Sequence, residues 1–408
     1  MSHSLSIFLL QLVIIIVASR LCAYIFKKMG QPAVMGEIVA GIALGPSLFG
    51  AMAPNFSAFI FPVSSLGNLQ MLSQIGLILF MFVIGMELDF NIIRKKARSA
   101  VFISNFSIVI PFLLGVGLAF FLHERFAPPS IPFYAFALFM GIAVSITAFP
   151  VLARIIKERN LMNTRLGTIS LTAAAIGDVT GWVVLAFVIA IARAEALNNS
   201  FYTVIAAAAY VLIMLFIIRP LLKKLSTQKA GTSLIRQSTL AIIFLILLLS
   251  SYCCEVIGIH ALFGAFMAGV VMPLEWNFRK LIIDKVEDVA SIMFLPLFFV
   301  LTGLRTEIGL LSDASLWGVC LIIIAAAIVG KFGGSTLAAR LTGEPAYESL
   351  AIGALMNTRG LMELIILNIG YDLGILSPQI FTMMVVMALV TTFMTCPLLD
   401  LLRRIYKQ

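Results

Sequence analysis

The fold of this chain is decided by residues 165–193, which read RLGTISLTAAAIGDVTGWVVLAFVIAIAR. The stretch is apolar or small almost throughout, arginine stands at both ends, and a single acid, Asp178, lies near its middle. About 20 apolar residues suffice for a helix to cross the hydrocarbon core of a membrane. A carboxylate at that depth costs at least about 2.5 to 3.5 kcal/mol, so it normally faces a cavity, a partner or an ion path. The stretch therefore predicts a membrane helix with a functional acid.

A second apolar run, residues 314–340, carries the base Lys331 near its middle. The composition agrees with a membrane protein, because 61% of the residues are hydrophobic and only 12% are charged. We expect an all-α polytopic membrane protein of about 13 transmembrane helices. The expected spans are 5–26, 33–50, 65–89, 98–122, 131–158, 165–193, 200–225, 236–257, 260–274, 286–304, 314–340, 347–371 and 378–403, of which 260–274 is the shortest.

The placement of lysine and arginine predicts the orientation of these helices. Alternate loops are strongly basic, whereas the other set holds only Arg125, Arg193 and Arg305. Because basic loops stay in the cytoplasm, we expect the N-terminus outside and the C-terminus inside. The net charge of +9 is then a topology signal that faces anionic lipid, and we expect no nucleic-acid partner. Nucleotide-binding glycine-rich loops are absent from the sequence, so the chain is expected to be a secondary transporter or a channel, not an ATP-driven pump or an enzyme.

The expected spans divide into two groups of six around one odd helix. This division predicts two inverted repeats, residues 1–193 and 233–408, joined by a linker helix and loop at 194–232. The whole chain, 1–408, is then a single transmembrane domain, and we expect no soluble regulatory domain.

The fifth span of each expected repeat is interrupted. One break is at residues 145–150, SITAFP, where Pro150 lacks an amide hydrogen and disfavours helix at the preceding residue. The other is at residues 357–360, NTRG, where Gly360 gives a comparable weak point. Broken helices leave backbone carbonyls and amides free to meet ions when they line a cavity. A proline kink and a glycine packing contact are the structural alternative.

Four side chains are expected at one depth. Counted from the cytoplasmic helix ends at 1.5 Å per residue, Asp178, Thr147, Lys331 and Thr358 fall within roughly 6 Å of one level. A carboxylate, a hydroxyl, loose backbone oxygens and a basic partner at one level predict an oxygen-ligand site for a monovalent cation, which sodium or potassium fits better than a transition metal.

Several motifs, taken in order along nearly the whole chain, resemble the monovalent cation:proton antiporter superfamily, on the branch of bacterial Na⁺/H⁺ and K⁺/H⁺ antiporters and plant cation/H⁺ exchangers. They are GEIVAGIALGPS at 36–47, GMELD at 85–89, TAFPVL at 147–152, GDV at 177–179 and MNTRGLMEL at 356–364.

The resemblance implies a homodimeric antiporter with a sodium/proton antiporter fold and an elevator-type alternating-access mechanism. Asp178 would bind either the cation or a proton, Thr147 and nearby carbonyls would complete the site, and Lys331 would offset the acid and the broken-helix ends. No cofactor is implied beyond the transported ions. Arg359 and Glu363, four residues apart on one helix face, could form a second buried charge pair with a structural or a gating role. The expected place is the bacterial inner membrane, with pH homeostasis as a function.

One position departs from the pattern of relatives, which usually carry Asp, Asn or Gln immediately before the key aspartate. This chain has Gly177 there. With one acid, exchange of one cation for one proton would be electroneutral. Two other classes stay open at this point: a sodium-coupled symporter of a small organic solute, whose site should not need a buried Asp and Lys pair, and a passive cation channel, which would lack proton coupling.

Overall fold

The computed structural model of the chain describes residues 2–87, 97–162, 164–193, 197–227, 237–273 and 276–406. These residues are helical with short connections, and no strand occurs among them. Twelve of the helical segments are long and apolar enough to cross a membrane. The prediction of an all-α polytopic membrane protein is therefore confirmed.

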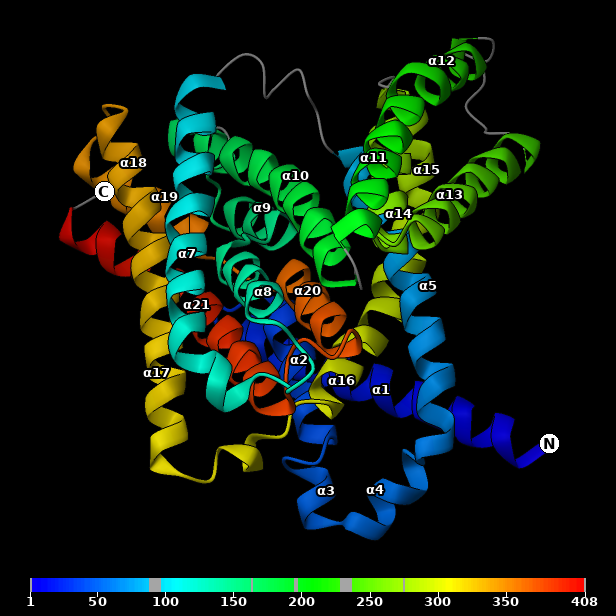
Figure 1. Cartoon of the computed structure of the whole chain (residues 1–408), viewed down its shortest axis with the longest axis vertical. Coiled ribbons are helices and arrows are strands. Elements are labelled where there is room, and N and C mark those ends of the chain that lie inside the picture. The colour runs from blue at the N-terminus through cyan, green and yellow to red at the C-terminus, as the bar shows by residue number, and fades with distance from the viewer. Residues whose placement is uncertain are drawn as a thin grey trace. The chain divides into compact units, whose positions relative to one another are not determined.

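Figure 1 follows the helices in chain order. They are α1 (Ser2–Lys28), α2 (Ala33–Leu44), α3 (Phe49–Met52), α4 (Pro54–Ile60), α5 (Val63–Glu87), α7 (Ala97–Phe126), α8 (Phe133–Ser145), α9 (Phe149–Glu158), α10 (Arg165–Arg193), α11 (Leu197–Ile213), η1 (Met214–Ile218), α12 (Arg219–Thr227), α13 (Gln237–Ile257), α14 (Ala261–Val270), α15 (Trp276–Val289), η2 (Ala290–Phe294), α16 (Leu295–Leu304), η3 (Ile308–Leu311), α17 (Ala314–Ile328), η4 (Val329–Gly333), α18 (Gly334–Leu341), α19 (Ala346–Met356), α20 (Leu361–Asp372) and α21 (Pro378–Ile405). Of these, η1, η2 and η4 are π-helical turns within longer helices.

One expected span needs correction. The helix predicted at 260–274 is α14, which has only 10 residues and is too short to cross the hydrocarbon core alone. The helix starts at Ala261, one residue after the predicted start, and ends at Val270, so the shortfall is at its C-terminal end, shortly before Pro273. A proline cannot continue a helix and disfavours helix at the residue before it. Three parts of the predicted features lie outside the described residues: residues 88–89 of the GMELD motif, the basic residues at 94–96, and residues 194–196 and 228–232 of the predicted linker.

The chain forms two compact units. Unit 1 comprises Met1–Pro62, Asn91–Leu185 and Phe299–Gln408, and unit 2 comprises Val63–Phe90 and Ala186–Phe298. Both expected ion-binding breaks and all the predicted site residues belong to unit 1. Each unit draws on both halves of the sequence, so this division differs from that of the predicted inverted repeats, which stays a prediction.

Small residues bring helices of unit 1 into backbone contact. In the crossing of α2 with α16, a Cβ added at Gly303 would lie 2.1 Å from the carbonyl carbon of Gly41. Such close approach is typical of membrane helices, where packing and not the hydrophobic effect drives association. The glycine-rich motif at 36–47 is thus a packing surface in this fold.

Substitution of Gly303 by alanine is expected to destabilise the protein strongly, because the added methyl group must push two backbones apart. The readout is the thermal unfolding midpoint of the purified protein. Gly318→Ala on α17 is the matched control, since a Cβ there meets nothing within 4 Å. Removing a helical glycine should leave that midpoint unchanged or slightly higher. Equal midpoints for the two variants would contradict the packing role of Gly303.

Candidate ion-binding site

The first break separates α8 from α9. Ile146 and Ala148 have extended backbones, with ψ of 142° and 93°, so the chain between Ser145 and Phe149 is not helical. Pro150 stands in the first turn of α9, where a missing amide hydrogen costs no helical hydrogen bond. The proline of the SITAFP motif therefore starts a new helix and does not kink a continuous one.

The second break separates α19 from α20. Asn357 caps the end of α19, and Gly360 directly before α20 has φ 152° and ψ −126°. Only glycine adopts that conformation readily, because a Cβ would clash with the backbone. The glycine of the NTRG motif is thus required by the local backbone geometry.

The two breaks meet each other. The amide of Ala148 donates a hydrogen bond to the carbonyl of Thr358 at 3.1 Å. The hydroxyl of Thr147 donates to the carbonyl of Met356 at 3.3 Å. Residues more than 200 positions apart in the chain are therefore joined at one crossing point, where four helix ends converge.

Two buried cations cap the C-terminal end of α8. Lys331 Nζ donates to the carbonyl of Ser145 and, at 2.9 Å, to that of Ser107 on α7. The guanidinium of Arg359 donates to the carbonyls of Ala143 at 3.1 Å and Val144 at 2.5 Å. The end of a helix leaves its last carbonyls without partners and carries a partial negative charge. Positive side chains therefore supply both hydrogen bonds and charge where α8 stops.

Lys331 itself lies in the π-turn η4, beside Gly330. A Cβ added at Gly330 would be 2.8 Å from Cα of Pro111 on α7, so the two backbones are in close contact. This approach lets the lysine side chain reach the Ser107 carbonyl while staying 0% exposed. The π-turn η4 and the close contact at Gly330 together set the position of Lys331 in unit 1.

Arg359 also forms an ion pair with Glu363. Arg359 NH1 and Glu363 Oε2 are 2.9 Å apart, and both side chains are 0% exposed. Glu363 lies in the first turn of α20, where the partial positive charge of the helix end favours an acid. One guanidinium therefore connects the end of α8 with the start of α20.

Asp178 is 2% exposed on α10, and neither of its carboxylate oxygens has a hydrogen-bond partner among the described residues. The amide of Phe149, at the start of α9, and the ammonium of Lys331 interact with it electrostatically. None of the ion pairs between described residues includes Asp178. An unpaired buried carboxylate is very costly. Asp178 is therefore a buried acceptor whose hydrogen-bond partner is not among the described residues.

The remaining predicted residue, Thr358, faces α21. Its hydroxyl donates to Thr395 at 3.4 Å, and the neighbouring amide of Arg359 donates to the hydroxyl of Thr392 at 3.1 Å. The side chain of Asn357 donates to the carbonyl of Thr391 at 3.4 Å. Three buried threonines of α21 thus hold the second break in place. Their clustering at 391–395 within an apolar run is a sequence signal that could have predicted this role, but it was not used above.

Ser104 on α7 was missed by the sequence analysis. A Cβ added at Gly177 would lie 3.4 Å from its hydroxyl, so this serine faces α10 one residue before Asp178. Its side chain is 0% exposed and its hydroxyl has no partner within the described part of the chain. The hydroxyl of Ser107 donates to the Ser104 carbonyl at 3.0 Å, which links this face to Lys331.

The groups that the structure associates with Asp178 are the backbone at the start of α9, the ammonium of Lys331 and, facing the preceding residue of α10, the hydroxyl of Ser104. No group of three or more His, Cys, Asp or Glu side chains that could hold a metal ion occurs among the described residues. In general, oxygen ligands of low total charge suit a monovalent cation better than a transition metal.

The long apolar helices, the crossed breaks and the buried charges together define an integral membrane transporter. Comparison with known proteins specifies the class, since the family model described as "Sodium/hydrogen exchanger, transmembrane" matches residues 14–401. The chain belongs to this family, which consists of transporters and not of enzymes.

Two relatives and one solved structure show how similar the chain is to known proteins. The chain is 42% identical over 398 residues to the Na⁺/H⁺ antiporter NhaS4 of Synechocystis, covering 97% of each chain. It is 36% identical to the K⁺/H⁺ antiporter 1 of Saccharomyces cerevisiae, covering 98% of this chain but 47% of the yeast protein. The sodium proton antiporter MjNhaP1 of Methanocaldococcus jannaschii superposes with a TM-score of 0.68 at 15% identity, over 97% of this chain and 96% of that one. The fold is therefore the sodium/proton antiporter fold, as the sequence predicted.

Replacement of Lys331 by methionine is expected to lower both stability and transport. The variant keeps the length of the side chain but leaves the Ser145 and Ser107 carbonyls without a donor, at about 1 to 3 kcal/mol for each buried group. Lys280→Met on α15 is the control, because that lysine is exposed. A normal unfolding midpoint together with normal cation affinity would contradict the capping role of Lys331.

Proposed function

We propose that this protein exchanges a monovalent cation, sodium or potassium, for protons across the membrane, with Asp178 binding either ion. The observation that carries the proposal is the buried carboxylate of Asp178, both of whose oxygens lack a partner among the described residues. The names of the relatives support the same activity, one being a Na⁺/H⁺ and the other a K⁺/H⁺ antiporter.

Competition at one carboxylate is the proposed basis of coupling. Burial disfavours the ionised acid, whereas the charge of Lys331 and the start of α9 favour it. With these effects in balance, a proton and a cation can displace each other. The bare carboxylate costs too much to move through the hydrocarbon region, so Asp178 crosses only when it is neutralised by either ion. Cation transport and proton transport are then coupled by competition at Asp178 alone.

The proposed cation ligands are Asp178, the hydroxyl of Thr147 and carbonyls of the two breaks near Thr358. Lys331, Arg359 and Glu363 stay within the protein as fixed charges that offset the helix ends. We propose that the crossed half-helices move with the site as a body, in an elevator-type cycle. Movement as a body preserves the hydrogen bonds that join the breaks, such as that from Ala148 to Thr358.

Proton flux in proteoliposomes with an imposed pH gradient tests the activity. Sodium, potassium or choline chloride is added to vesicles that contain the wild-type protein or Asp178→Asn. We expect one alkali cation or both to dissipate the gradient through the wild type alone, whereas choline should not. Failure of every alkali cation to do so, under either membrane polarity, would overturn the proposal.

A single acid in the site predicts electroneutral exchange. Gly177 contributes no second carboxylate or amide beside Asp178, so one cation replaces one proton. A membrane voltage acts on moved charge by about 2.3 kcal/mol per 100 mV. We therefore expect equal exchange rates at zero voltage and at about 100 mV imposed by a permeant lipophilic ion. A clear dependence of the final ion gradient on voltage would show that net charge moves.

We further propose that the protein works as a homodimer in the bacterial inner membrane, with its N-terminus outside, its C-terminus in the cytoplasm, and pH homeostasis as one role. The basic loops support this orientation through the positive-inside rule. Attachment of a membrane-impermeant thiol reagent to a cysteine introduced at Ser2 tests the orientation in intact cells. Labelling only after permeabilisation would reverse the topology.

A further inference from the structure

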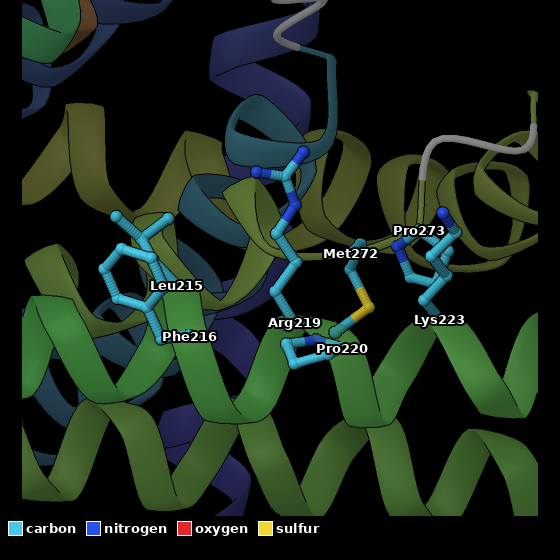
Figure 2. A pocket seen from close by; sticks show the side chains of 7 residues that line it. All are labelled: Leu215, Phe216, Arg219, Pro220, Lys223, Met272 and Pro273. Carbon is cyan, nitrogen blue, oxygen red and sulfur yellow. The ribbon is translucent and has the colours of Figure 1, made fainter.

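A pocket and a polar cluster both lie outside the proposed ion-binding site. The pocket, of about 660 Å³, is in unit 2, and Figure 2 shows Phe216, Arg219 and Met272 among its lining residues. The cluster is in unit 1, between the end of α16 and the last turns of α20. Because α20 begins at the second break, a change in the cluster reaches the ion-binding site through one helix.

Arg305, the residue directly after α16, contacts three side chains of α20. Its NH1 group donates to Oδ1 of Asn368 at 2.8 Å, its NH2 group lies 2.9 Å from Oδ1 of Asp372, and its guanidinium carbon lies 5.4 Å from the centre of the Tyr371 ring. The side-chain amide of Asn368 donates in turn to the hydroxyl of Thr302 on α16 at 2.8 Å. An ion pair, a charge-assisted hydrogen bond, a cation–π contact and a neutral hydrogen bond therefore join the two helices.

The end of α16 is held against α2. A Cβ added at Gly303 would lie 2.1 Å from the carbonyl carbon of Gly41, so the two backbones touch. Directly beyond this contact, the hydroxyl of Ser47 donates to the carbonyl of Thr306 at 2.8 Å and accepts from the amide of Ile308 at 3.0 Å. Backbones in direct contact cannot slide past each other without separating, because no flexible side chain lies between them. We therefore treat α2 and the end of α16 as one rigid pair.

α20 belongs to the crossing of the two breaks. Its first turn carries Glu363, whose ion pair with Arg359 connects it to the carbonyls at the end of α8. In the elevator-type cycle, and here the inference rests on the proposed function, the crossed half-helices move as a body relative to the rigid pair. A shift of one helical turn is about 5.4 Å, which is more than a hydrogen bond can stretch. The bonds of Asn368 to Thr302 and Arg305 must then break.

The cluster lies at the outer end of both helices in the proposed orientation. In the turn before α2, towards the cytoplasmic end, the side chain of Gln31 donates to the carbonyl of Phe393 on α21 at 3.3 Å, a longer bond without charge. Charge-assisted hydrogen bonds are roughly twice as strong as neutral ones. The cluster therefore stabilises a state in which the outer ends of α16 and α20 are together and the ion-binding site faces the cytoplasm.

We infer that Arg305 is the latch of an outer gate: its contacts with α20 close the path from the ion-binding site to the outside, and they break each time the site faces outward. The latch binds no transported ion. It sets the fraction of molecules whose site faces outward, because its contacts exist in only one of the two states. Loss of the latch increases that fraction, and the apparent affinity for a cation added outside increases by the same factor.

Labelling of a buried thiol tests the latch without relying on transport. Thr302→Cys is prepared in a protein whose five native cysteines are replaced by alanine, and right-side-out vesicles are treated with a membrane-impermeant thiol reagent. Thr302 is 0% exposed and bonded to Asn368, so the reagent reaches position 302 only when α20 moves away. Addition of Arg305→Gln should increase the labelling rate about fivefold, which is the effect of one lost hydrogen bond on the open fraction.

Arg125→Gln is the matched control, because Arg125 is another arginine of the sparsely charged loops predicted to lie outside. Its NH2 group donates to the hydroxyl of Ser315 on α17 at 3.4 Å. The control removes the same charge from the same side, so it should leave the labelling rate unchanged. In vesicles that exchange ions, Arg305→Gln should also lower the half-saturating concentration of a cation added outside about fivefold, and Arg125→Gln should not.

Equal labelling rates with and without Arg305→Gln would overturn the latch. An equal increase in Arg125→Gln would overturn it too, because surface charge would then account for the effect. If the wild type exchanges no alkali cation while Arg305→Gln still increases labelling, the proposed function fails and the latch is supported. Asn368→Ala is the second variant if Arg305→Gln does not fold, since it removes the bonds to Thr302 and Arg305 and should also increase the labelling rate.

Discussion

Asp178→Asn is expected to abolish cation/proton exchange while the protein remains folded. The asparagine amide has the size of the carboxylate. It does not take up a proton near neutral pH, and it has no charge to attract a cation. The thermal unfolding midpoint should be equal to or higher than that of the wild type, because the substitution removes a buried carboxylate that has no partner among the described residues. A gain in stability with a total loss of exchange is a result that general misfolding could not produce.

Cation binding gives the same variant a second readout. A ligand that binds only the folded state stabilises it by about 2.7 kcal/mol at 100 times its dissociation constant. The wild-type midpoint should therefore rise with the concentration of the transported cation, and Asp178→Asn should lose that rise. Asp284→Asn, an exposed acid of α15, is the control and should behave as the wild type. Undiminished exchange in well-folded Asp178→Asn protein would exclude Asp178 as the ion carrier.

Local sequence patterns were sufficient to predict most of the fold. Each long apolar run corresponds to a helix, because a chain in lipid must satisfy its backbone hydrogen bonds within the segment. The exception at 260–274 had the right composition, but α14 ends at Val270, shortly before Pro273, which cannot continue a helix. The π-turn at Lys331 could not be predicted either, since one extra residue in a turn leaves no mark in an apolar pattern.

The site was predictable where its chemistry is unusual in a membrane. Asp178, Lys331 and Arg359 stand out because ionisable groups at that depth are costly. The partners of these groups could not be predicted from local patterns. Arg359 bonds to the carbonyl of Ala143, 216 residues away, and that contact depends on how the two breaks cross. Ser104 gave no signal, because a single serine in a membrane helix is ordinary.

Removal of Arg359 from its buried ion pair with Glu363 should be among the most destabilising single substitutions in unit 1. Arg359→Met leaves an uncompensated Glu363 and two carbonyls of α8 without their donor. Removal of one partner of a buried pair costs about 3 to 5 kcal/mol. Glu363→Gln should cost less, because Arg359 keeps its bonds to Ala143 and Val144. The measurement is the free energy of unfolding in mixed micelles for both single variants and the double variant.

The double variant tests the coupling itself. Arg359→Met/Glu363→Gln should be more stable than Arg359→Met alone, because it no longer buries an unpaired charge. Arg154 and Glu158 on α9 provide a matched control, with the same residue types, the same spacing and a 3.0 Å ion pair, but with side chains 43% and 42% exposed. Because water screens exposed pairs, the same cycle there should give at most about 1 kcal/mol. Equal coupling energies at the two pairs would mean that burial adds nothing at Arg359, and that its bonds to the end of α8 carry its whole effect.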